Sequence, residues 1–131
     1  MADKLHFSLV SPAREVFSGE VDHVIAPGTD GEFGVLPNHA PFMSTLKNGV
    51  VRVLEAENVS MRVFVRGGFA DVTPEGLTIL AEEAVNLADV NPTELAKDLQ
   101  AAREKAKANP EDAIAQRNQD YLAALQDAVA N

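Results

Sequence analysis

The first two thirds of the chain follow the two-residue period of β-strands. In residues 5–9 (LHFSL), apolar and polar side chains alternate, which places one face of a strand in a core and the other in water. Turn-forming pairs such as Asn48-Gly49 and Gly67-Gly68 interrupt the apolar runs. Further runs of this type cover residues 15–17, 21–26, 42–46, 50–54, 61–66, 69–73 and 77–81. The pattern predicts about eight to ten short, mostly antiparallel strands in a β-sandwich, because one open sheet would leave long edges unpaired.

The pattern changes to helical spacing near residue 87. Residues 87–131 contain twelve alanines and no glycine. A capping asparagine, a proline for the first turn and a capping-box glutamate occupy residues 91–94 (NPTE). Residues 109–110 (NP) end this helix, because the residue before a proline is biased out of the helical region. We therefore expect two domains, a β-sandwich at 1–86 and an antiparallel α-helical hairpin at 87–131.

Apolar residues recur at spacings of three and four in both expected helices. The stripe of the first consists of Leu95, Leu99, Ala102 and Ala106, and that of the second consists of Ile114, Tyr121, Leu122, Leu125, Ala128 and Val129. Burial of so few large side chains, at about 1.5–3 kcal/mol each, hardly exceeds the entropy lost in ordering the hairpin. A hairpin held this weakly is expected to dock on a partner, or change position, more readily than a core helix.

Composition and charge narrow the classes of function. With 46% hydrophobic and 24% charged residues among 131, the chain has the composition of a folded globular protein. Its net charge of −9 would repel a phosphate backbone, so we expect no nucleic-acid partner. The sequence also lacks the run of about 18 apolar residues that a membrane span needs, so we expect no direct membrane insertion.

Residues 31–41 (GEFGVLPNHAP) concentrate two glycines, two prolines, one carboxylate and one imidazole. Such a segment is either a catalytic loop or a contact surface. His6, His23 and His39 stand alone, without the paired spacing of metal ligands, and the chain has no cysteine. It also lacks a nucleophile elbow, a phosphate-binding loop and a dinucleotide fingerprint. We therefore expect no catalytic residue, metal site or cofactor, with a small sandwich enzyme or metalloprotein as the alternative.

Three segments carry a resemblance to a known family. Residues 9–21 (LVSPAREVFSGEV), 31–41 (GEFGVLPNHAP) and 65–72 (VRGGFADV) resemble the epsilon subunit of bacterial F-type ATP synthases, whose mitochondrial counterpart is called delta. The resemblance covers essentially the whole chain, in order. It implies a non-catalytic rotor subunit of the central stalk, which couples proton flow to ATP synthesis and lies on the cytoplasmic face of the bacterial inner membrane as a peripheral part of the complex.

The resemblance also implies the partners of the chain. In the family, positions matching Gly31, Glu32 and Phe33 lie near the polar loops of the ring of membrane c subunits. Positions matching His39, Ala40 and Pro41 lie toward the gamma subunit. The hairpin is implied to reach the alpha and beta subunits of the catalytic head. A turn stiffened by proline loses little freedom on binding, and the Glu32 carboxylate suits an arginine on a ring loop.

Some members of the family bind ATP on the hairpin, through a pattern of Ile or Leu, Asp, two further residues, Arg and Ala. The corresponding stretch here is 90–95 (VNPTEL), where Asn91 replaces the aspartate and Glu94 the arginine. A glutamate would repel the triphosphate. These residues therefore argue against ATP binding here. The second helix has only Arg117 as a basic residue, which weakens its electrostatic attraction to acidic regions of a catalytic head, so we expect weak or absent inhibition of ATP hydrolysis by the hairpin. An ATP-sensing regulatory subunit whose hairpin binds ATP is the alternative function.

Overall fold

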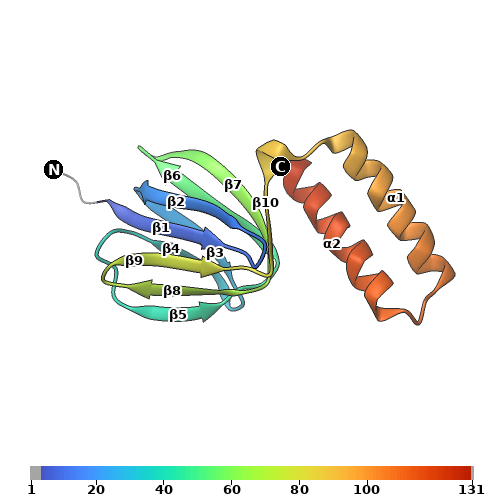
Figure 1. Ribbon diagram of the computed structural model, residues 1–131, viewed down its shortest axis with the longest axis horizontal. Coiled ribbons are helices and arrows are strands. Elements are labelled where there is room, and N and C mark those ends of the chain that lie inside the picture. Colours follow the sequence, from blue (N-terminus) through green and yellow to red (C-terminus); the bar gives the residue numbers. More distant parts are fainter. Residues whose placement is uncertain (1–3, 131) are drawn as a thin grey trace. The chain divides into compact units, whose positions relative to one another are not determined.

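The computed structural model describes residues 4–130, which form two compact units (Figure 1). The boundary between the units in the chain lies between Ala88 and Asp89. The first unit contains ten strands in two five-stranded sheets, in the orders β2-β1-β9-β8-β5 and β10-β7-β6-β3-β4. The strands are β1 (Leu5–Val10), β2 (Glu15–Val21), β3 (His23–Gly28), β4 (Gly31–Val35), β5 (Phe42–Thr45), β6 (Gly49–Glu55), β7 (Asn58–Arg66), β8 (Phe69–Thr73), β9 (Gly76–Leu80) and β10 (Glu83–Asn86). All pair antiparallel except β1 with β9. The predicted sandwich of eight to ten mostly antiparallel strands is confirmed.

The core of the sandwich follows the alternation in the sequence. In β1, Leu5, Phe7 and Leu9 are buried, while His6 between them is exposed. These three side chains belong to one cluster that both sheets build, together with valines of β6 and β7. Because successive side chains of a strand point to opposite faces, the period of two is enough to fill the space between the sheets.

The segment 31–41 lies along one edge of the sandwich. Its first half is β4, the last strand of one sheet, and its second half crosses to β5, the last strand of the other sheet. Within the described residues, β4 pairs with β3 alone and β5 with β8 alone. Both sheets therefore end at the segment that the sequence singled out.

The second unit is a pair of helices, α1 (Pro92–Ala108) and α2 (Ala113–Ala130), preceded by a short 3₁₀ helix η1 (Leu87–Asp89). Asn91 caps α1 as expected, since its side-chain oxygen accepts hydrogen bonds from the N–H groups of Thr93 (3.0 Å) and Glu94 (3.2 Å). The four residues of the expected stripe of α1 are all buried. The predicted helical hairpin is confirmed. No helix in residues 4–130 is long and apolar enough to cross a membrane.

The expected stripe of α2 is wrong at one end. Leu125 and Ala128 are buried, but Ile114 is 72% exposed. At this end, the side of α2 that faces α1 carries Ala115 and Gln116, whose Nε2 donates to the carbonyl oxygen of Ala106 (2.9 Å). The contact line drifts around a straight helix, because 3.6 residues per turn do not match a fixed repeat of seven.

Candidate functional site

The first half of the segment, at the start of β4, presents a carboxylate. Gly31 and Glu32 are exposed, whereas Phe33 is half-buried and packs against the core cluster of the sandwich. Of the three residues expected near the ring of c subunits, Phe33 therefore supports the edge from inside, and Glu32 is the side chain that reaches outward.

Glu32 has a partner within its own chain. Nη2 of Arg52 donates to Oε1 of Glu32 at 2.9 Å. Arg52 lies in β6, and β3 runs between β6 and β4, so this ion pair spans a strand. The sequence suggested an arginine partner for Glu32 but placed it on another protein. Arg52 was missed because its distance from Glu32 depends on the order of strands, which no local pattern reveals.

The second half of the segment, in the crossover to β5, presents an imidazole. His39, Ala40 and Pro41 are all exposed. The backbone N–H of His39 donates to the carbonyl oxygen of Leu36 (3.2 Å), which closes a turn. Nδ1 of His39 lies 2.9 Å from the carbonyl oxygen of Ala40 and donates to it, because a carbonyl only accepts. The imidazole is therefore held to its own backbone.

Phe42 joins the two halves. Its ring lies 5.2 Å from that of Phe33 in an edge-to-face arrangement, and 5.3 Å from the imidazole of His39. A second tie lies at the turn between β3 and β4, where the N–H of Thr29 donates to the carbonyl oxygen of Thr45 (3.1 Å). The two threonine hydroxyl oxygens are also hydrogen-bonded at 2.9 Å. These contacts connect the last strands of the two sheets.

An apolar patch beside this edge was not foreseen. Met43 in β5, Phe69 in β8 and Leu80 in β9 are 66%, 37% and 43% exposed. Phe69 pairs directly with Leu80, and Met43 lies diagonal to Phe69 across the β5–β8 pairing, so the three share one face of the sheet. The signal was present in the run 77–81 (LTILA), where Leu80 occupies a position whose face should be polar. Exposed apolar side chains gathered in this way mark interaction surfaces more often than isolated ones do.

The remaining histidines lie apart from this edge segment or serve its packing. His6 is exposed on β1, and the imidazole of His23 is half-buried beside Gly34. In the described part of the chain, no three His, Asp or Glu side chains are grouped in a way that would hold a metal ion.

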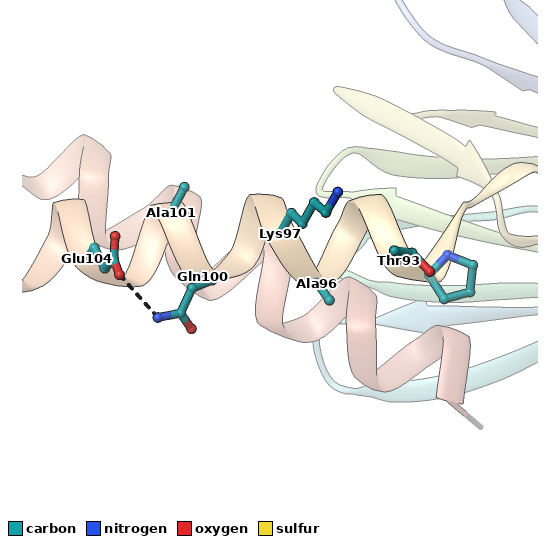
Figure 2. Close-up of a pocket in the computed structure, with 7 residues that line it drawn as sticks. Thr93, Ala96, Lys97, Gln100, Ala101 and Glu104 are labelled. Atoms are coloured by element: carbon teal, nitrogen blue, oxygen red, sulfur yellow. Dashed lines mark hydrogen bonds between the residues drawn. The ribbon is translucent and has the colours of Figure 1, made fainter.

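The start of α1 contains the stretch 90–95, which is compared above with an ATP-binding pattern, and it carries little positive charge. Figure 2 shows the side chains around a shallow hollow along this helix. Lys97 is the basic side chain among them, while Gln100 donates to the carboxylate of Glu104 (3.3 Å) farther along. The Asn91 side chain, which would stand in the place of a ligand-binding aspartate, is engaged as the helix cap. A triphosphate here would meet Lys97 as the one cation of the hollow, with Glu104 also lining it and Glu94 in the first turn of the same helix.

Comparison with known proteins identifies the family. Residues 4–87 match the family model described as "ATP synthase, Delta/Epsilon chain, beta-sandwich domain". The chain belongs to this family. The resemblance stated from the sequence is thereby confirmed.

Relatives within the delta/epsilon family match over most or all of the chain. The ATP synthase epsilon chain of Hyphomonas neptunium is 63% identical over 135 aligned positions, covering 100% of both chains. That of Maricaulis maris is 56% identical over 82% of this chain and 80% of its own length. The first of these matches spans the full length of both chains, so it includes the helical part as well as the sandwich.

Solved structures show the same fold. A chain in the Euglena gracilis mitochondrial ATP synthase, solved as OSCP, F1 and c-ring in a rotational state, superposes with a TM-score of 0.74 at 26% identity. The match covers 94% of this chain and 78% of that one. A chain of the Tetrahymena thermophila central stalk and c-ring superposes with a TM-score of 0.56 at 16% identity, which bears on the fold alone.

Proposed function

We propose that the chain is the epsilon subunit of an F-type proton-translocating ATP synthase, a non-catalytic part of the rotor. It joins the gamma subunit to the ring of c subunits and so couples proton flow to ATP synthesis. The observation that carries this proposal is the 63% identity to an ATP synthase epsilon chain over the full length of both proteins. Removing the chain from the purified synthase should abolish proton-driven ATP synthesis, and adding it back should restore it. Full synthesis without the chain would contradict the proposal.

The contact with the ring of c subunits lies at the start of β4. Gly31 and Glu32 are exposed there, and the strand is fixed by the aromatic pair of Phe33 with Phe42. A rotor contact transmits torque, and a stiff edge loses less freedom on binding than a mobile loop does. The Glu32 carboxylate offers an acceptor for a cationic side chain of the ring.

Replacing the carboxylate of Glu32 by an amide tests this contact. Glu32→Gln keeps the shape and removes the charge, and an exposed ion pair contributes up to about 1 kcal/mol, or roughly fivefold in affinity. Glu57→Gln is the matched control, since Glu57 is an exposed carboxylate between β6 and β7, at the opposite end of the same sheet. Binding to a purified subcomplex of gamma and the ring should fall for the first variant alone. Equal affinities for both variants would rule out the contact.

The contact with gamma lies around His39, Ala40 and Pro41, and the apolar patch of Met43, Phe69 and Leu80 extends it. A permanent interface between subunits is more apolar than the rest of a protein surface, which this patch resembles. Leu80→Ser should weaken association with gamma by about 1 kcal/mol, or roughly fivefold, because about half of the side chain remains to be buried. Val59→Ser is the control, since Val59 is an exposed apolar residue on the other sheet. Equal losses for the two variants would count against this surface.

The domain at 1–86 carries both contacts, and the hairpin at 87–131 reaches the catalytic head formed by the alpha and beta subunits. Through the ring, the chain is held at the cytoplasmic face of the bacterial inner membrane. Arg117 is the one basic residue of α2, so this helix has little positive charge with which to bind acidic regions of the head. Deleting residues 88–131 should therefore change the ATPase rate of the complex only slightly. A large rise would show that the hairpin is a strong inhibitor.

A further inference from the structure

We propose that Arg52 is a positioning residue for the ring contact: it fixes the Glu32 carboxylate so that the second oxygen, Oε2, is presented to a cationic group of the partner. This inference rests on the proposed function, because it assumes that Glu32 meets the ring. It adds to the proposed contact a residue that lies outside the segment 31–41 and twenty positions from Glu32 in the sequence.

The register of the second sheet brings Arg52 to Glu32. Ile25 of β3 pairs with Arg52 of β6 on one side and with Gly34 of β4 on the other, so these three positions form a row on one face of the sheet. Glu32 lies two residues before Gly34 and therefore faces the same way. Two strand spacings amount to about 9.6 Å, so a long side chain is needed to reach across β3.

The β4 position of this row, Gly34, carries no side chain. A Cβ at position 34 would lie 2.5 Å from Nε2 of His23, so the glycine there leaves room for an imidazole to lie over β4. Glu32 therefore lies on the edge strand β4, two residues before Gly34, over which the imidazole of His23 lies, and Arg52 reaches it across β3. Its side chain is 56% accessible, so the carboxylate can be reached from solvent while it is bound to Arg52.

Stability alone does not account for Arg52. The pair is partly exposed, with 36% and 56% of the two side chains accessible, and such pairs contribute little to folding. Nε of Arg52 is shielded from solvent and has no hydrogen-bond acceptor among the described residues. A shielded donor without an acceptor costs more than an exposed ion pair contributes. The arrangement is therefore better explained by what it does to Glu32 than by what it adds to the sandwich.

The arrangement favours binding by reducing the freedom of the carboxylate. A glutamate on a strand edge samples several rotamers, and a partner that needs one of them must restrict the others on binding. Oε1 is assigned to Arg52, and the described residues give Oε2 no hydrogen bond. Because a carboxylate accepts from two sides, Oε2 keeps its capacity for a cation of the ring.

The experiment is a double-mutant cycle on the full chain, with affinity for the purified subcomplex of gamma and the ring as one readout and thermal unfolding as the other. Arg52→Met keeps much of the stem and removes the guanidinium. It should weaken binding about fivefold without lowering the unfolding temperature, while Arg52→Lys should restore part of the affinity. In the Glu32→Gln background, Arg52→Met should have no further effect on binding. Arg62→Met is the matched control, because Arg62 of β7 pairs with Arg52 and lies on the same face.

The charge-swapped chain, with Glu32→Arg and Arg52→Glu, separates positioning from a purely structural role. It restores the ion pair but presents the wrong charge to the ring, so it should fold normally and bind no better than Glu32→Gln. Normal binding by this chain would overturn the inference, as would an equal effect of Arg52→Met in both backgrounds. Normal binding by Glu32→Gln would contradict both the proposed ring contact and this inference. If Glu32→Gln binds weakly and Arg52→Met normally, the inference alone falls.

Discussion

Replacing Phe42 by alanine should loosen the edge that carries both proposed contacts. The change removes two ring contacts at once, with Phe33 at 5.2 Å and with His39 at 5.3 Å. A fully buried Phe→Ala change costs about 3–5 kcal/mol. Phe42 is half-buried at the margin of the core, so about half of this, roughly 2 kcal/mol, is expected.

Thermal unfolding of the full chain, followed by the β-sheet signal in circular dichroism, measures this loss. A domain of 60–100 residues loses about 4–8 °C for each kcal/mol, so the transition of the sandwich should fall by roughly 8–16 °C. Met43→Ala is the control, because Met43 is the next residue of β5 and points to the opposite, exposed side. It should cost less than about 0.5 kcal/mol.

Hydrogen exchange locates the effect. In the Phe42→Ala protein, amides of β4 and β5 should exchange faster, while those of β1 and β9 in the middle of the first sheet should change less. An unfolding temperature as high as that of Met43→Ala would refute the reasoning, because Phe42 would then not join the two edge strands. A uniform loss of protection across the sandwich would refute it as well.

Three further changes test other parts of the fold. Gly68→Ala should destabilise the sandwich by more than about 2 kcal/mol in chemical denaturation, because φ is +109° and the added Cβ would lie 2.0 Å from the carbonyl oxygen of Leu80. Asn91→Ala should cost the helical unit about 0.5–2 kcal/mol, seen in the thermal loss of the helical signal, because two N–H groups lose their acceptor. The hydrogen bond from Lys4 holds the pKa of Asp22 below its ordinary value of 3.8, so the pair stabilises the folded state above that pH. The stability difference between wild type and Asp22→Asn should therefore be present at neutral pH and shrink as the pH falls through the lowered pKa of the folded state; a constant difference would contradict this.

The fold could be predicted to the extent that it depends on local periods and caps. Alternation in residues 5–9 placed Leu5, Phe7 and Leu9 in the core, and the asparagine at position 91 fixed the start of α1. Both signals act within a few residues of the chain. Ile114 shows the limit of such reasoning, because which side of a helix is covered depends on how its neighbour crosses it.

The site could be predicted only in part, for a related reason. The segment 31–41 stood out because its glycines, prolines and polar side chains are concentrated in one run. Arg52 and the apolar patch are brought to it by the order of strands in two sheets, and sheet order is a non-local property. Phe33 stays a predicted contact residue, and the structure adds that its place in the alternation of β4 also packs it against the core.

Photo-crosslinking in the assembled synthase tests the central claim, that one stiff edge of the sandwich meets the ring on one side and gamma on the other. A photo-reactive residue is placed at Glu32, at His39 or, as a control, at Glu57, and each crosslinked partner is identified by mass spectrometry. The account predicts that position 32 links to a c subunit, that position 39 links to gamma, and that position 57 links to no c subunit. Crosslinks from positions 32 and 39 to the same subunit, or from position 32 to no part of the ring, would contradict it.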